Sequence, residues 1–349
     1  MTALSHEDRA ALVDSVRRLL ADRCTEADVR RIMDSESGHD PALWRALADM
    51  GVPGLTIAAE HGGAGLGPVE LELVMEEAGV ALLPAPLLSC TIAAALLADG
   101  DAGDLLPGIA DGSFIATVAF AGAGGWSGEG DVIVRGGRAT GTARFVTDAA
   151  IADAVLIASD DGAYLPLHAP RVTPLPVFDR TRRMADVTFY GEVRRVGDAA
   201  AVRRALDLAV VALAGEQAGV ARRVLEMSVG YAAERHQFGR AIGSFQAVKH
   251  MAADLLLESE SATSAARDAA EHLAAGSGER EAAVALAAFA CADAAVRCTK
   301  DAIQMHGGIA FTWAHPAHLY LRRARSAAQM FGASPLWRDR YLTALEAMA

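Results

Sequence analysis

Apolar residues recur at helical spacing along the first third of the chain. Leu12, Val16 and Leu19 lie three or four positions apart, as on the buried face of an amphipathic helix. A further stretch of helical period over residues 68–78 begins at a proline, which helices accept in their first turn. The pattern predicts an N-terminal helical domain over residues 1–112.

The period shortens to that of strands over residues 113–195. Short runs rich in β-forming residues alternate there with Gly and Asp turns, which predicts a central antiparallel, barrel-like β domain. Four long stretches of helical period follow over residues 196–349, the last predicted as one helix from Pro316 to Met348. They indicate a C-terminal four-helix bundle. The expected fold class is mainly α with a β insert.

Composition excludes several classes of function. The 349 residues are 52% hydrophobic and 22% charged, so a large core is possible and wholesale disorder is not. With 32 basic and 44 acidic residues the net charge is −12, which argues against nucleic-acid binding. The four cysteines show neither CxxC spacing nor clustered histidines, so no metal site is expected. No signal core and no apolar run of about 20 residues is apparent, so we expect a cytoplasmic protein without a membrane span.

Two segments that connect helices of the predicted bundle contain charged, aromatic and glycine residues that a simple connection does not need. Residues 235–246 place two arginines, two phenylalanines and a terminal glutamine in one corner, and arginine pairs bidentately with phosphate oxygens. Residues 304–313 contain the adjacent glycines Gly307 and Gly308, whose backbone can approach a ligand closely. Ordinary connectors remain the alternative for both segments.

Both segments resemble signatures of the acyl-CoA dehydrogenase family. RHQFGRAIGSFQ resembles the family's RxxFGxxIxxFQ motif, and QMHGGIAF resembles its QxxGGxGF motif. The resemblance extends over essentially the whole chain and implies the acyl-CoA dehydrogenase fold, FAD as cofactor, an acyl-CoA substrate and an electron-transfer flavoprotein as acceptor. The FAD contacts that it implies, made across a subunit interface, fall on Arg235, Phe238 and Gln246, with Gln304, Gly307 and Gly308 at the adenosine end.

A third segment resembles the family's flavin-ring motif, usually Trp-x-Thr. By this resemblance Phe145 would pack beside the isoalloxazine and Thr147 would offer its hydroxyl to the N5 side. An edge strand that ends in a turn explains the same residues equally well.

The catalytic glutamate of the family has no counterpart at either of its two usual places. Phe331 and Ala209 occupy these positions, although the reaction needs a base to remove an α-proton. The nearest acids on the same predicted helix are Glu216, on the same face but about 10 Å further along the axis, and Asp207, about 200° around it. Both are weak candidates, because acids on long helices are mostly solvated.

A further departure from the family and a further resemblance suggest a specialised subunit. The family's polar substrate loop is replaced by residues 117–124, and the stretch 179–189 with Arg182 and Arg183 resembles the short β-subunits of actinobacterial α2β2 acyl-CoA dehydrogenases of steroid side-chain degradation. The resemblance implies a full-length partner that contains the base. A surface loop that pairs with local acids remains the alternative for the two arginines. A self-sufficient homotetramer with an unrecognised base and a flavin-free structural paralogue remain as alternatives.

Overall fold

Helices form the first part of the chain, as expected. The structure, a computed structural model, describes residues 4–98, 100–120, 126 and 131–348. The helices of this part are α1 (His6–Arg23), α2 (Glu26–Asp34), α3 (Pro41–Asp49), α4 (Pro68–Ala81), α5 (Leu87–Leu97) and α6 (Leu106–Ala110). The side chains of Ser5, Thr25 and Asp40 accept hydrogen bonds from the first turns of α1, α2 and α3, so three consecutive helices begin at capping residues.

A seven-stranded sheet follows the N-terminal helices. Its strands are β1 (Ala116–Ala119), β2 (Ile133–Arg135), β3 (Arg138–Thr147), β4 (Ala154–Ser159), β5 (Gly162–Pro166), β6 (Arg171–Pro174) and β7 (Met184–Asp198). Hydrogen bonds connect them in the order β1-β4-β5-β7-β3-β2, with β6 against β7. The expectation of a wholly antiparallel sheet is wrong at one pair, because β1 and β4 run parallel. The intervening chain, which includes β2 and β3, is long enough for the crossover that a parallel pair requires.

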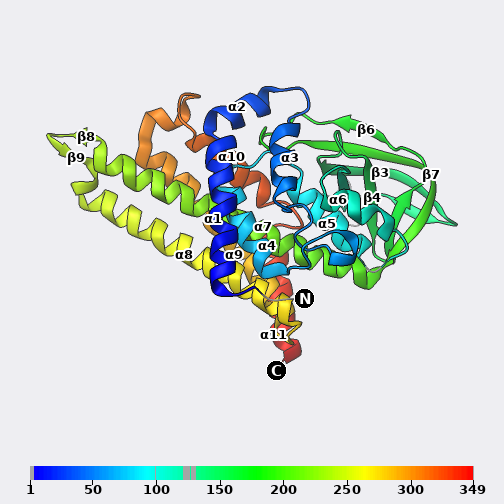
Figure 1. Ribbon diagram of the computed structural model, residues 1–349. Coiled ribbons are helices and arrows are strands. Elements are labelled where there is room, and N and C mark those ends of the chain that lie inside the picture. The colour runs from blue at the N-terminus through cyan, green and yellow to red at the C-terminus, as the bar shows by residue number, and fades with distance from the viewer. Residues whose placement is uncertain (1–3, 99, 121–125, 127–130, 349) are drawn as a thin grey trace.

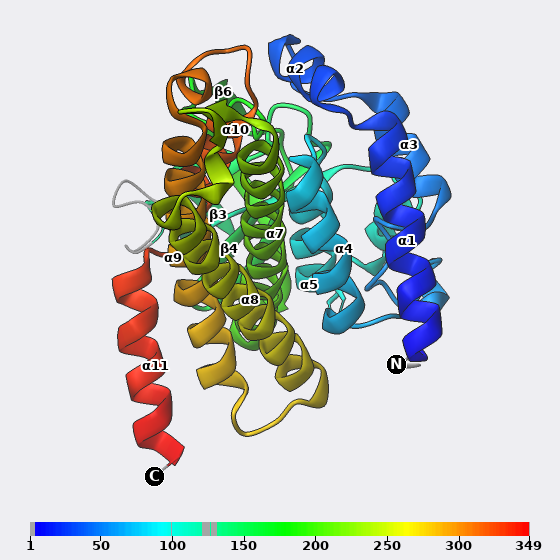
Figure 2. The same ribbon diagram turned by 90° about the vertical axis from the view of Figure 1, so that its left-hand side faces the viewer.

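Long helices dominate the C-terminal part. They are α7 (Ala199–Glu234), α8 (Gln246–Ala275), α9 (Arg280–His306), α10 (Ala317–Ala327) and α11 (Ser334–Met348), and the two-residue strands β8 (His236–Gln237) and β9 (Arg240–Ala241) form a hairpin between α7 and α8. Figure 1 shows this hairpin at the end of the molecule opposite the sheet, and Figure 2 shows α11 standing apart from α8.

The single helix expected from Pro316 to Met348 is wrong. The chain leaves helical geometry after α10 and resumes it at Ser334. Phe331 and Gly332 between the two helices both have positive φ angles, 59° and 113°, which a right-handed helix cannot accommodate. Periodicity missed the break because buried apolar residues continue through it.

Helices α4 and α7 approach each other through small residues. A Cβ atom added at Gly79 would lie 2.0 Å from the carbonyl oxygen of Glu216, and one added at Gly219 would lie 1.9 Å from that of Glu76. Only glycine allows backbones to come this close. The contact joins the N-terminal helices to the bundle and places the middle of α7 against α4.

One helical stretch, Arg280–Phe311, is long and apolar enough to cross a membrane by length and composition alone. The expectation that no stretch reaches this length is therefore wrong. In the fold 61% of its most apolar window is buried, as in a core helix of a bundle.

Candidate functional site

A β-bulge positions the predicted flavin-ring residues. The pairing of β3 with β7 shifts register between Ala143 and Val146, and Phe145 within the bulge has a φ of 56°. Thr147 ends the strand with its hydroxyl 2.9 Å from the Ser89 hydroxyl of α5, while the Thr117 hydroxyl of β1 donates to its carbonyl at 2.7 Å. Thr147 is therefore buried at the junction of β1, β3 and α5, and its hydroxyl already has a partner.

A buried cluster of charges lies next to Thr147. Glu216 of α7 forms ion pairs with Arg182 and, at 3.6 Å, with Arg323 of α10, and Arg323 lies 3.2 Å from Asp179. All four side chains are at least nine-tenths buried. The expectations of a solvated Glu216 and of Arg182 on a surface loop are both wrong, because α10 and the segment before β7 pack onto the middle of α7.

Burial and the neighbouring carboxylates act in opposite directions on the pKa values of the two arginines. Burial lowers the pKa of Arg182, opposed by the charge of Glu216. For Arg323 burial acts in the same sense, but Asp179 and Glu216 outweigh it and the pKa is raised. Burial raises the pKa of Asp148, whose carboxylate accepts a 2.6 Å hydrogen bond from Ser89. A buried network of this kind is costly to break, because removing one partner leaves an uncompensated charge.

The space left beside this cluster is small. A cavity of about 20 Å³ is lined by Thr147, Asp148, Arg182 and Glu216, among others, and one oxygen of Glu216 has no hydrogen-bond partner among the described residues. Such a volume holds about one water, whereas pockets for cofactor-sized ligands measure roughly 300–1,000 Å³. An isoalloxazine ring does not fit beside Thr147 in this arrangement.

Aromatic rings surround the first of the two usual base positions. Phe331 is 4% exposed and makes edge-to-face contacts with Phe120, at a centroid distance of 5.8 Å, and with Trp126, at 5.0 Å. The replaced substrate loop is described here only through Phe120, and residues 121–124 lie outside the described part of the chain.

Ala209, at the second base position, is fully buried on α7. The next residue, Val210, lines a cavity of only about 10 Å³ together with Phe331. Val210 and Phe331 thus belong to one apolar wall, and Ala209 is buried next to Val210 in the chain.

Asp207 lies apart from this wall. Its side chain is 22% exposed and 3.6 Å from Arg280 of α9, and burial raises its pKa to about 6 although Arg280 acts in the opposite sense. The expectation of a solvated acid is wrong here too, because the start of α9 covers this turn of α7.

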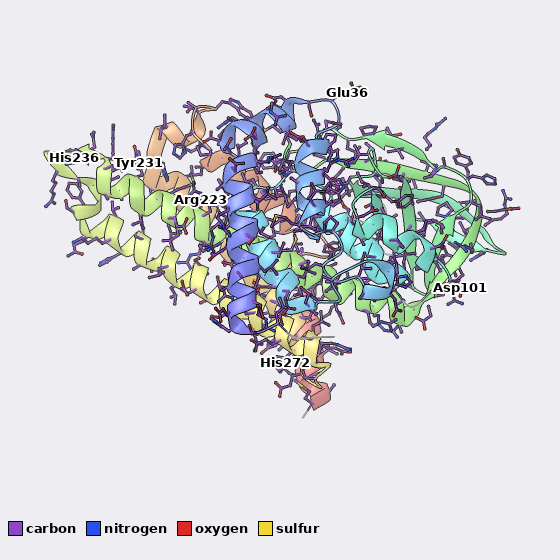
Figure 3. All side chains as sticks on the ribbon, in the orientation of Figure 1. Glu36, Asp101, Arg223, Tyr231, His236 and His272 are labelled. Atoms are coloured by element: carbon purple, nitrogen blue, oxygen red, sulfur yellow. The ribbon has the colours of Figure 1, made fainter. Side chains whose placement is uncertain are left out.

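The hairpin presents its predicted cofactor residues to solvent. Phe238 is 91% exposed at a turn where its φ is 54°, and the guanidinium of Arg240 lies 4.1 Å from the ring centre of Phe245. Arg235 and Gln246 are exposed at the two bases of the hairpin. Figure 3 shows His236 and Tyr231 at this end of the molecule, far from the seven-stranded sheet.

The second predicted segment lies beside the hairpin. Tyr231, one turn before Arg235, stacks on His306 with 4.6 Å between ring centres, which brings Gln304, Gly307 and Gly308 to the same end of the bundle. Gly307 has a φ of 65°, and a Cβ added at Gly308 would meet nothing within 4 Å. The structure thus collects six of the predicted cofactor residues at one exposed end and leaves Phe145 and Thr147 at the centre.

Sequence reasoning overlooked several members of these clusters. Arg323 is buried at helical spacing from Leu319 and Ala327, so the period of α10 already indicated an inward-facing arginine. Ser89 and Asp179 gave no comparable signal. Among the described residues no group of three or more His, Cys, Asp or Glu side chains could hold a metal ion.

Comparison with known proteins supplies the family. The model of the acyl-CoA dehydrogenase N-terminal domain matches residues 6–112, and that of the C-terminal domain matches residues 199–344. The acyl-CoA dehydrogenase IpdE2 of Mycolicibacterium smegmatis is 36% identical over 327 residues, 93% of this chain and 95% of that protein.

Two solved structures are similar along their full length. A variant of the Tcur3481–Tcur3483 steroid acyl-CoA dehydrogenase (ACAD) has a TM-score of 0.90 at 28% identity over 98% of both chains. The ChsE4–ChsE5 complex from Mycobacterium tuberculosis has a TM-score of 0.89 at 29% identity over 99% of both. These matches confirm the resemblance and the fold class expected from the sequence.

Proposed function

Because the chain belongs to the acyl-CoA dehydrogenase family, FAD-dependent oxidoreductases that act on acyl-CoA, we propose that it is a base-less subunit of a heteromeric member. It completes the FAD site of a full-length partner in an α2β2 assembly and does not build a catalytic centre of its own. The filled centre beside Thr147 supports this proposal most directly.

The charged side chains in that centre are already paired within the chain. Arg182 and Arg323 both form ion pairs with Glu216, so its carboxylate is engaged within the chain. Phe331 and Ala209 supply only apolar surface. We therefore assign Glu216 a structural role, which disfavours the homotetramer with Glu216 as its base.

At the opposite end of the molecule, by contrast, the predicted cofactor residues Arg235, Phe238 and Gln246 are exposed. Arg235 is exposed and forms no ion pair within the described part of the chain, so its fork of donors is free for the pyrophosphate of FAD. Phe238 and Phe311, 91% and 78% exposed, would be covered by a partner. When bound, FAD supplies the hydride acceptor of the family's α,β-desaturation. This exposed half-site disfavours the flavin-free structural paralogue.

The relatives suggest the substrate class and the assembly. One solved relative is described as a steroid ACAD and another as a complex of two chains. By this likeness the substrate is a CoA ester of a steroid side chain, which binds at the partner's catalytic centre. An electron-transfer flavoprotein would take the electrons, and the assembly would work in the cytoplasm.

The deciding experiment uses the Arg235→Ala variant in complex with a full-length acyl-CoA dehydrogenase whose gene neighbours the gene of this chain. We expect the complex to assemble and to lose FAD, because a bidentate arginine–phosphate pair is hard to replace while an exposed arginine contributes little to stability. Bound flavin per complex is measured by absorbance after gel filtration.

Gly308→Val is the companion variant. A Cβ at this position meets no atom of the chain itself, so loss of FAD would report contact with the cofactor rather than misfolding. Arg325→Ala, at an exposed position of α10, is the matched control and should retain FAD. Unchanged flavin content in both Arg235→Ala and Gly308→Val would refute the proposed half-site.

A further inference from the structure

A stack of three rings connects the last turn of α7 to the turn after α9. The ring of His306 stacks on that of Tyr231, with 4.6 Å between ring centres and 27° between ring planes, and contacts the tilted ring of His315 at 4.5 Å and 50°. Its Nδ1 atom is 2.7 Å from the carbonyl oxygen of Ala302, one turn earlier in α9. The ring is 4% exposed, so it is almost fully enclosed.

The turn that follows His306 has few other attachments. In the short helix Gly307–Phe311 only Ala310 is buried, while Gly308, Ile309 and Phe311 are exposed. The position of this turn therefore depends chiefly on His306 at its start and Ala310 within it.

The stack also determines where the turn lies relative to the hairpin. Tyr231 precedes Arg235 by one helical turn, and the backbone N–H of Arg235 donates to the carbonyl oxygen of Tyr231 at 2.8 Å. His306 is directly followed by the two glycines. A single ring contact thus connects two segments that are about 70 residues apart in the chain and that the proposed function assigns to one nucleotide.

We propose that His306 is a positioning residue that, through its stack on Tyr231, holds the Gly307–Gly308 turn at the distance from Arg235 at which both segments contact the same dinucleotide. The inference rests on the proposed function and deepens it. The ligand chemistry is that of an adenosine diphosphate group, with the arginine on the phosphates and the glycine turn on the nucleoside.

The test compares substitutions at both rings in the complex with the full-length partner, with the dissociation constant of FAD measured by flavin fluorescence. His306→Leu removes the ring, and we expect a three- to tenfold weaker affinity, the equivalent of about one aromatic pair. His306→Phe retains a ring of similar shape and should remain within about twofold of the parent.

A double-mutant cycle separates positioning from a general loss of packing. If the stack acts as a unit, Tyr231→Leu and His306→Leu together weaken FAD binding no more than either alone. Fully multiplicative losses would overturn the proposal. Should His306→Leu fail to fold, Tyr231→Leu, at a half-buried position, together with His306→Phe tests the same contact.

Tyr341→Leu is the matched control. It removes another interhelical ring pair, that of Phe289 and Tyr341 at 5.9 Å, on a face of α9 that the half-site does not include, and should leave FAD affinity unchanged. Arg235→Ala separates the two hypotheses. If Arg235→Ala weakens FAD binding and His306→Leu does not, only the positioning role fails, and if neither does, the proposed function fails.

Discussion

Backbone conformation distinguishes three phenylalanines from the other aromatic residues. Of the five non-glycine residues with positive φ among those described, three are Phe145, Phe238 and Phe331. Such a conformation costs about 1–3 kcal/mol and persists where the surroundings enforce it. Each of the three lies at a position that the family motifs had singled out, so the strain coincides with the flavin-ring strand, the hairpin and the missing base.

A carboxyl group in the core should make stability depend on pH. Glu72 of α4 is fully buried, and neither of its oxygens has a hydrogen-bond partner among the described residues. Burial, and next to it the charge of Glu76, raise its pKa from 4.5 to about 8. Between these values the folded chain holds a proton that the unfolded chain has lost, so stability decreases as the pH rises through this window.

Glu72→Gln removes that dependence, because the amide does not titrate. We expect the variant to be more stable than the parent at pH 8 by about 1–3 kcal/mol, the cost of an uncompensated buried group, and the difference to shrink towards pH 5. Urea unfolding at pH 5, 6.5 and 8 measures it. Glu346→Gln, at an exposed position of α11, should leave the pH profile unchanged. Parallel profiles for Glu72→Gln and the parent would contradict this role of Glu72.

At the scale of elements, the crossing of α4 and α7 determines where the middle of α7 lies. Gly219→Ala would place a methyl group 1.9 Å from the carbonyl oxygen of Glu76, so the helices must separate. We expect a loss of about 1–3 kcal/mol. Gly230→Ala on the same helix is the control, because its Cβ meets nothing within 4 Å. It should stabilise the chain by about 0.5–1 kcal/mol through helix propensity. Equal effects of the two changes in a thermal melt would show that the crossing is not tightly packed.

The whole molecule combines a filled centre with an exposed half-site, which sets the expected stoichiometry. We expect one FAD for each pair of unlike subunits, measured as flavin absorbance against protein mass.

The chain alone should show no acyl-CoA oxidation, since lack of a positioned base costs about 10²–10⁴-fold. Phe331→Glu should not restore activity, because Arg182 and Arg323 still occupy the space beside Thr147. Two flavins per pair, or turnover by the isolated chain, would be incompatible with this assignment.

The sequence by itself determined the features that depend on neighbouring residues. Helical period predicted long helices in the part of the chain that forms α7, α8 and α9, because apolar residues recur there at helical spacing. Short motifs identified the hairpin and the glycine turn, because their chemistry lies within about a dozen consecutive positions.

Tertiary structure decided the features that depend on contacts between distant segments. The break before Ser334, the burial of Glu216 and the ring stack of His306 each involve partners from other elements, such as Arg323 of α10 or Tyr231 of α7. No local pattern records which segment will cover a given face of a helix. Whether an acid on α7 is solvated or enclosed by two arginines was therefore settled only when the three parts of the chain packed together.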